Sequence, residues 1–389
     1  MAVNEFAYAT DFAFDGSDVP VALVHASAET GPGPPADQRT VMPHPPQSAT
    51  LRQPQAPDRR DGYRLTLSAY RDELRAEVER RWNAEQEEPE TICRHALLPA
   101  GKLVRPLLCL ESAAAVGGTA AQVMPAALGI EGGHVASLIH DDIIDGDDTR
   151  RGRPAVQHLF GIDRAILAGD RMIFSMFQGL AECQDRGIAT ERIVHALRVF
   201  ADMGADLCRG ATVELALGGD ASCTVDGYLT MARLKTAAGI RGACQVGAIL
   251  GGGTPAQVRA LGVYGEELGT AFQIQDDLLP YEHDHPPTGK PATSDLRNRR
   301  PTLPILLAYR TARPDEREVI EQMLAGHLSP HTAHRRIHEV VHRTGAMTAA
   351  RRIAQRHLRH ARDALAALPA TTSRTRLTLL TDDVIRSGR

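Results

Sequence analysis

Three observations predict an all-α fold for this chain of 389 residues. From Tyr63 onward, apolar side chains such as Leu67, Tyr70 and Leu74 recur at spacings of three and four positions, as on one face of a helix. Segments rich in Ala and Leu continue this pattern almost to the end of the chain, and clusters of glycine and proline separate them. No stretch alternates apolar and polar residues for long enough to predict a strand. We therefore expect roughly ten to thirteen helices.

The first segment, residues 1–60, differs from the rest in composition. It carries nine of the 24 prolines among small and polar residues, without helical or strand periodicity. We predict a disordered Pro-rich tail over residues 1–60 and one large helical domain over residues 61–389.

Charge and composition exclude several classes of protein. The formal net charge is −4, which gives no electrostatic reason to bind nucleic acid. No apolar run approaches the ~18 residues that span a bilayer, and the first 38 residues lack Lys and Arg, unlike a secretory leader. The six cysteines form no CxxC pair, which favours reduced thiols. We expect a cytoplasmic protein without a membrane span or a nucleic-acid partner.

The first chemical signal is the acidic segment His140–Asp145, which contains Asp141, Asp142 and Asp145. Positions three and four apart lie on one side of a helix, so we expect the three carboxylates to face the same way. Carboxylates this close repel one another and need compensating cations. Oxygen ligands suit Mg²⁺, which completes its coordination with water and substrate phosphates.

A second acidic pair, Asp276-Asp277, lies far downstream in the apolar segment Phe272–Leu279. Two acidic helices that face each other across a bundle are a known way to hold a metal cluster. Basic residues that suit diphosphate oxygens accompany both acidic segments. These residues are Lys102, Arg105, Arg150, Arg151, Lys235, Lys290 and Arg300. The combination indicates Mg²⁺-assisted chemistry on a diphosphate.

Over residues 63–389 the sequence resembles the trans-prenyl diphosphate synthases. The family pattern of two aspartates, two other residues and a third aspartate, followed by paired arginines, is matched by Asp141, Asp142, Asp145, Arg150 and Arg151. The second family motif is matched by the run from Phe272 to Asp277. The resemblance implies a single large helical bundle of the isoprenoid synthase type with a central apolar cavity.

The resemblance also implies roles for individual residues. Three Mg²⁺ ions would bind between the two acidic segments, with Asp141, Asp145 and Asp276 as ligands and Asp142 and Asp277 in support. The allylic diphosphate, which is dimethylallyl, geranyl or farnesyl diphosphate, would contact Arg150, Lys235 and Lys290. Arg300 is a further substrate-binding residue. Isopentenyl diphosphate would contact Lys102, Arg105, His134 and Arg151. Thr236 and Gln273 would lie beside the developing allylic cation, and the enzyme would be a homodimer.

Two departures from the family pattern affect the acidic and basic sets. Pro280 stands where a third aspartate of the second motif is common, and it tends to end the helix there. We expect Asp284, which follows Pro280 by about one helical turn, to substitute for the missing carboxylate. Arg300 stands where a lysine is usual, which preserves the positive charge.

Residue size indicates the product length. Ala136 and Ser137 precede Asp141 by about one helical turn, so we expect them to line the cavity in which the hydrocarbon tail grows. Both are small, which favours a product of twenty carbons or more, such as geranylgeranyl diphosphate. The candidates for the cavity floor are Met172, Phe174, Met176 and Phe177. The alternatives are a longer-chain synthase, a class I terpene cyclase and a non-catalytic partner subunit of a heteromeric synthase.

Overall fold

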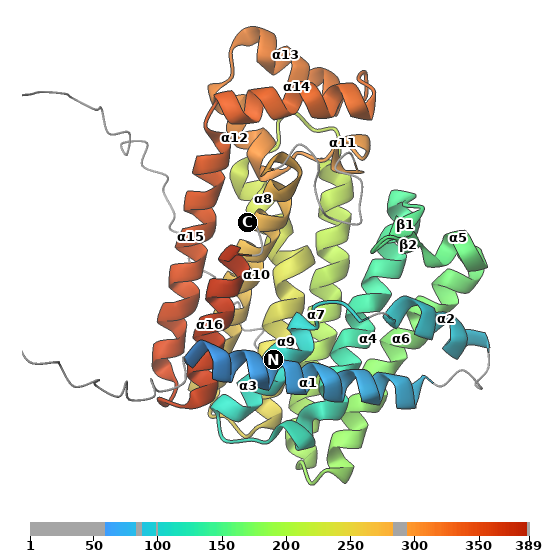
Figure 1. The fold of residues 1–389 in the computed structure, drawn as a ribbon, viewed down its shortest axis with the longest axis vertical. Helices are drawn as coiled ribbons and strands as arrows, with labels where there is room; N and C mark the ends of the chain where they lie inside the picture. Colours follow the sequence, from blue (N-terminus) through green and yellow to red (C-terminus); the bar gives the residue numbers. More distant parts are fainter. Residues whose placement is uncertain (1–58, 83–87, 99, 283–293, 387–389) are drawn as a thin grey trace, which may run out of the picture. The chain divides into compact units, whose positions relative to one another are not determined.

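The computed structural model describes residues 59–82, 88–98, 100–282 and 294–386. All of them belong to one compact unit, Ala56–Arg389, and its all-α architecture confirms the predicted fold class (Figure 1). The predicted tail lies almost wholly outside the described residues. The described part contains sixteen α-helices, more than expected, because helices of only 4 to 11 residues lie between 294 and 324. Short helices of this kind leave too few apolar repeats to be counted from sequence.

The helices follow one another with short connections. The first half of the unit contains α1 (Arg59–Arg81), α2 (Glu88–Leu97), α3 (Val104–Ala115), α4 (Ala120–Asp145), α5 (Val156–Phe160), α6 (Ile162–Asp185) and α7 (Thr190–Leu217). The second half contains α8 (Val225–Ala232), a π-helical segment (Arg233–Ala237), α9 (Ala238–Leu250), α10 (Pro255–Glu282), α11 (Ser294–Arg297), α12 (Leu303–Thr311), α13 (Pro314–Leu324), α14 (Pro330–Arg343), α15 (Ala346–Ala364), a 3₁₀ turn (Leu365–Ala367) and α16 (Thr372–Arg386).

Helix α4 lies at the centre of the packing. All ten residues from Val123 to Gly132 are buried, which is the pattern of a helix surrounded by neighbours on every side. It packs against α3, α6 and α9, while α9 also contacts α7 and α10. The acidic segment at the end of α4 and the acidic pair on α10 are therefore carried by elements that meet through α9.

A small hairpin follows α4. Thr149 pairs with Pro154 and Arg150 with Arg153, in an antiparallel ladder formed by β1 (Thr149–Arg150) and β2 (Arg153–Pro154). The two residues of its turn, Arg151 and Gly152, both have positive φ angles of 52° and 72°, as in a type I′ turn. A ladder this short has no sequence periodicity, so it was not predicted. It places the side chains of Arg150 and Arg151 next to the end of α4.

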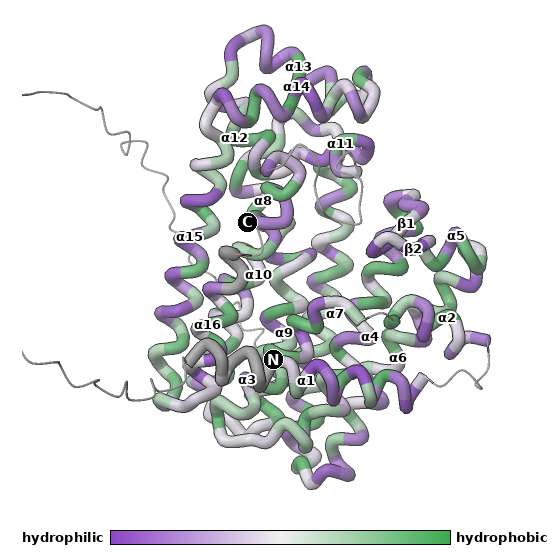
Figure 2. Tube along the Cα trace, in the orientation of Figure 1, coloured by the Kyte–Doolittle hydropathy of each residue, from purple (hydrophilic) through white to green (hydrophobic). Residues whose placement is uncertain are grey.

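Helices α13 and α14, at the top of the unit in Figure 1, are rich in hydrophilic residues (Figure 2). On α14 only four residues, Ala333, Ile337, Val340 and Val341, are buried. In the part of the chain that the structure describes, no helix combines the length and apolar character needed to cross a membrane. The six cysteines form no disulfide, as predicted.

Candidate active site

A cavity of about 1150 Å³ lies between α3, α4, α7, the π-helical segment and α10. Fourteen of the predicted site residues line it: Lys102, Arg105, His134, Ser137, Asp141, Asp145, Arg150, Arg151, Lys235, Thr236, Gln273, Asp276, Asp277 and Arg300. Lys290 lies outside the described residues, as does Asp284. The two acidic segments, remote in sequence, thus open into one cavity, together with most of the predicted cations.

The first acidic cluster divides between two faces of α4. Asp141 and Asp145 line the cavity, whereas Asp142 lines a small neighbouring pocket and is 2% exposed. Both oxygens of Asp142 accept hydrogen bonds from Nε of Arg150, at 2.9 and 3.1 Å. The expectation that all three carboxylates face the same way is therefore wrong for Asp142, because one step along a helix turns the side chain by about 100°.

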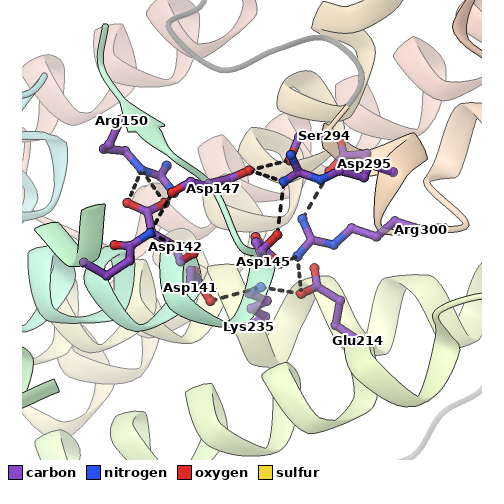
Figure 3. Close-up of polar contacts among 12 residues, drawn as sticks. Asp141, Asp142, Asp145, Asp147, Arg150, Glu214, Lys235, Ser294, Asp295 and Arg300 are labelled. Carbon is purple, nitrogen blue, oxygen red and sulfur yellow. Dashed lines mark hydrogen bonds and ion pairs between the residues drawn. The ribbon is translucent and has the colours of Figure 1, made fainter. Parts of the chain in front are cut away.

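The end of α4 is held in place by contacts to α11. Gly146 ends the helix with a φ of 62°, and the backbone N–H of Asp147 donates to the carbonyl of Asp142 at 2.9 Å. The carboxylate of Asp147 then accepts hydrogen bonds from Ser294 (3.2 Å) and Arg297 (2.5 Å). These contacts join the loop after α4 to α11 and fix where the first acidic cluster lies relative to Asp295 (Figure 3).

Lys235 and Thr236 lie in the π-helical segment between α8 and α9, a local widening that is frequent at functional sites. Nζ of Lys235 lies 3.4 Å from Oδ1 of Asp141. The hydroxyl of Thr236 donates to Oε1 of Gln273 at 2.5 Å, and the amide of Gln273 donates to Asp277 at 2.8 Å. This chain of hydrogen bonds fixes the amide of Gln273 at the cavity wall.

The second acidic pair titrates far from the ordinary range. Enclosure by the cavity walls raises the pKa of Asp276 to about 7, although its side chain faces the cavity and Lys102 and Arg105 oppose the rise. Burial and the negative charge of Asp295 raise the pKa of Asp277 to about 7. The hydroxyl of Tyr228 and the amide of Gln273 are polar groups beside the carboxylate of Asp277. A positive charge nearby would favour the ionised form of both carboxyls, so their oxygens are suited to a positively charged ligand.

Pro280 does not end α10 at its own position. The helix continues to Glu282, so Pro280 lies in the last turn, where it lines the cavity. A carboxylate that the sequence analysis did not select, Asp295 on α11, lies in the same cavity and raises the pKa of both Asp276 and Asp277. Asp295 thus supplies a carboxylate to the part of the cavity that contains Asp276 and Asp277, where the second motif has Pro280 in place of a third aspartate.

A basic group that consists of Lys102, Arg105, His134 and Arg151 lies in the cavity on the side of Asp276. Nη1 of Arg105 lies 3.2 Å from Nε2 of His134. Since a guanidinium only donates, Nε2 accepts and the imidazole is neutral. Burial, with Arg105 and Arg151 adding to it, lowers the pKa of His134 well below its usual value. Glu131, which the sequence analysis missed, is buried near both arginines.

Glu214 is a third charged residue of the cavity that the sequence analysis did not select, after Asp295 and Glu131. It lies on α7 and contacts both Lys235 and Arg300 (Figure 3). Its sequence context is an ordinary amphipathic helix, so no local signal distinguishes it. Arg300 also donates to Asp145 at 2.6 Å and to Asp295 at 3.1 Å.

The apolar part of the cavity extends away from the carboxylates. Ser137 lines it on α4, but Ala136 does not, because Ala136 is fully buried in the packed core. Met176 and Phe177 line it, as do residues that the sequence analysis did not name, including Phe200 and Met203 on α7. The other two floor candidates lie elsewhere: Met172 is fully buried in the core, and Phe174 is 63% exposed.

Comparison with known proteins identifies the family. A profile described as polyprenyl synthetase matches residues 86–342. A short chain isoprenyl diphosphate synthase from Methanothermobacter thermautotrophicus is 36% identical over 300 residues, which cover 76% of this chain and 90% of the relative. Other relatives are named as farnesyl, geranylgeranyl and geranylfarnesyl diphosphate synthases, so the comparisons leave the product length open.

Solved structures agree with this assignment. A geranylgeranyl pyrophosphate synthetase from Pyrococcus horikoshii superposes with a TM-score of 0.76 at 28% identity, covering 84% of this chain and 99% of the other. A polyprenyl synthase from Caulobacter crescentus, complexed with calcium and isoprenyl diphosphate, superposes with a TM-score of 0.77 at 28% identity, covering 86% and 99%. With two acidic motifs in one cavity of an isoprenoid synthase fold, the chain belongs to the polyprenyl synthetase family and is a prenyltransferase, a trans-prenyl diphosphate synthase.

Proposed function

We propose that this enzyme joins isopentenyl diphosphate to an allylic diphosphate and releases geranylgeranyl diphosphate. One observation carries the proposal: the carboxylates of Asp141 and Asp276 and the basic group around Arg105 line the same cavity, whose deeper part is apolar. An acidic region and a separate basic region suit two diphosphates, and the apolar part suits a hydrocarbon chain.

The carboxylates of the cavity fit divalent metal ions. The proposed ligands, Asp141, Asp145 and Asp276, line one cavity and offer the oxygen donors that Mg²⁺ prefers. Within those residues, no three His, Cys, Asp or Glu side chains gather closely enough to hold an ion by themselves. Diphosphate oxygens and water would therefore complete the coordination of the proposed three ions. When bound, Mg²⁺ supplies charge neutralisation to a leaving diphosphate.

The chain's own cations bind the two diphosphates. Lys235, Arg300 and, in the segment outside the described residues, Lys290 are proposed to face the allylic diphosphate. Arg150, whose guanidinium is oriented by Asp142, joins them. Departure of that diphosphate leaves an allylic cation, which Thr236 and Gln273 face through the side-chain oxygens that their hydrogen bond fixes.

Isopentenyl diphosphate is proposed to bind the basic group around Arg105. Arg105, His134, Lys102 and Arg151 line one part of the cavity, and the neutral imidazole of His134 is held by Arg105. The apolar walls exclude water, which would otherwise quench the cation before the isopentenyl double bond attacks it. This attack forms the new carbon–carbon bond and leaves a tertiary cation on the isopentenyl unit. Loss of a proton from the adjacent carbon to the released diphosphate then forms the double bond of the product.

The proposed product length rests on the cavity wall nearest the acidic cluster. Ser137, one helical turn from Asp141, is small, whereas bulky side chains line the cavity from α6 and α7, among them Met176, Phe177 and Phe200. A tail therefore passes Ser137 before it meets bulky side chains on α6 and α7. This supports twenty carbons over fifteen.

The decisive experiment incubates the purified chain with Mg²⁺, isopentenyl diphosphate and farnesyl diphosphate and determines the product by mass. Geranylgeranyl diphosphate is expected. A longer product would make the enzyme a longer-chain synthase, and a hydrocarbon formed from a prenyl diphosphate alone would indicate a cyclase. No elongation by this chain alone, with activity restored by a second protein, would indicate the partner subunit.

The oligomeric state and the location of the enzyme stay predictions. A homodimer is supported by apolar side chains exposed on α6 and α7, which are Ile162, Ile166, Leu167, Ile173, Phe174, Val194 and Leu197. A second copy is proposed to cover them.

A further inference from the structure

Glu214, near the end of α7, is the shared counter-ion of two cations that come from separate parts of the chain. One oxygen, Oε2, accepts a hydrogen bond from Nζ of Lys235 and another, at 3.1 Å, from Nη2 of Arg300. The side chains of all three residues are less than a fifth exposed. Such a contact between charges in a poorly hydrated site is stronger than the same contact on the surface.

The same two cations also contact the first acidic cluster. Lys235 lies 3.4 Å from Asp141, and Arg300 donates to Asp145 at 2.6 Å. Each cation is thus shared between Glu214 on α7 and a carboxylate on α4 (Figure 3). Glu214 neutralises part of the positive charge of the two cations. Asp141 and Asp145 therefore attract these cations less strongly than they would without Glu214.

The backbone of the π-helical segment is positioned by the same helix. A Cβ atom on Gly210 would lie 2.3 Å from the backbone nitrogen of Lys235. The backbone of α7 therefore approaches the π-helical segment at a distance that only glycine allows at position 210. Gly210 and Glu214 are one helical turn apart and share a face of α7. That face therefore sets the backbone position of Lys235 through Gly210 and the position of its ammonium group through Glu214.

We propose that Glu214 is a positioning residue that holds Lys235 away from full pairing with Asp141 and shares Arg300 with Asp145, so that divalent metal ions meet less competition for the oxygens of those two carboxylates. The inference rests on the proposed function, since it assigns Asp141 and Asp145 to metal binding. Without the negative charge of Glu214, Lys235 and Arg300 pair more strongly with Asp141 and Asp145. Both cations then compete with Mg²⁺ for the oxygens of these carboxylates.

The test measures binding and does not depend on turnover. The full-length protein is titrated with MgCl₂ at a fixed concentration of inorganic pyrophosphate, and the rise in unfolding temperature reports binding. Since Mg²⁺ and free pyrophosphate associate equally in every sample, differences between variants come from the protein. Glu214→Gln is expected to raise the Mg²⁺ concentration for half-maximal stabilisation about tenfold, the scale of one neighbouring charge lost from a partly buried site.

Two further variants distinguish a role of Glu214 in Mg²⁺ binding from a role in the stability of the fold alone. Glu214→Asp keeps the charge and is expected to restore most of the Mg²⁺ response, and it carries the test if the glutamine variant does not fold. Glu191→Gln makes the same chemical change at an exposed residue near the start of α7 and is expected to leave the response unchanged.

The possible outcomes are distinct. A lower unfolding temperature for Glu214→Gln with an unchanged Mg²⁺ midpoint would give Glu214 a role in the stability of the fold alone and overturn the proposal. An aspartate variant as impaired as the glutamine variant would also overturn it. Failure of the wild-type enzyme to elongate prenyl diphosphates would overturn the proposed function instead, and that result is obtained in a separate assay.

Discussion

The guanidinium of Arg300 donates a hydrogen bond of 2.6 Å to the carboxylate of Asp145, which lies 155 positions earlier in the chain. The same guanidinium donates at 3.1 Å to Asp295 on α11. A planar fork of donors makes this possible, because its two terminal nitrogens point at different acceptors. Arg300 therefore links the acidic end of α4 to the segment that follows α10.

Replacing Arg300 by lysine should loosen this link. A single ammonium group cannot keep both contacts, so we expect the metal-free protein to lose about 1 kcal/mol of unfolding free energy. Because the lysine competes less for Asp145, the Mg²⁺ concentration for half-maximal activity should fall severalfold. Chemical denaturation and Mg²⁺ titration of activity measure the two effects. Arg313→Lys, at a side chain that is 60% exposed, is the control, and an unchanged Mg²⁺ midpoint for Arg300→Lys would contradict the expectation.

The pH dependence of Mg²⁺ binding follows from the raised pKa values of Asp276 and Asp277. Their carboxyls ionise near pH 4 in the unfolded chain. Between there and about pH 7 the folded protein holds more protons than the unfolded chain, so the metal-free protein loses stability as pH rises through this window. Mg²⁺ must displace the same protons, so its affinity should rise with pH and level off above about 7.

Calorimetric titration with Mg²⁺ in two buffers of different ionisation enthalpy checks this prediction. Proton release should be largest below pH 7 and should vanish at higher pH. Equal affinity at pH 6 and pH 8 would show that the raised pKa values of Asp276 and Asp277 do not govern metal binding.

The sequence predicted the fold class and the chemical character of the acidic segment on α4, because these depend on local patterns. Periodic apolar residues predict helices, and a run such as Asp141-Asp142-Ile143-Ile144-Asp145 carries its chemistry in its own spacing. The short helices between 294 and 324 and the two-residue ladder around Arg150 lack such patterns. Their positions depend on tertiary contacts, for example that of Asp147 with Ser294 and Arg297.

The same distinction applies to the cavity. Residues with a motif around them, such as Asp276 and Lys235, were selected from sequence, whereas Glu214 and Asp295 were not. A single acid on a helix is usually solvated, and only the three-dimensional structure brings Glu214 against two cations. Helix rotation explains the other difference: one position separates Ser137, which lines the cavity, from Ala136, which is buried in the core.

Product length should respond to Ser137. A phenylalanine there would project into the cavity about one turn from Asp141, so we expect Ser137→Phe to shorten the main product by five carbons or more. Mass spectrometry of the products measures the change, and Ser137→Ala should leave the length as in the wild type. Ala136→Phe would instead overpack the core and cost roughly 1–3 kcal/mol of stability. A full-length product from a folded Ser137→Phe enzyme would contradict the proposed path of the tail.

The binding of isopentenyl diphosphate should depend on Gly101. A Cβ atom at this position would lie 2.5 Å from Nη2 of Arg151, so Gly101→Ala should push the guanidinium aside. We expect the KM for isopentenyl diphosphate to rise about tenfold, the loss of one charge-assisted contact, with the KM for the allylic substrate nearly unchanged. Gly62→Ala, where a Cβ atom would meet nothing within 4 Å, is the control. A rise in both KM values would place Arg151 outside the isopentenyl site.

Helix α6 provides the test of the predicted homodimer. Phe174 is 63% exposed and Leu167 is 64% exposed, which is costly for large apolar side chains that no partner covers. In a two-fold symmetric dimer each residue of the interface occurs twice, so a single Phe174→Glu change introduces two charges into one apolar contact. We expect the wild type to sediment at twice the mass of one chain, and the variant to sediment as a single chain. Leu215→Glu, at another exposed apolar residue that is near the end of α7, distinguishes this face from a general effect of added charge. A variant at Phe174 that sediments like the wild type would show that α6 does not form the interface.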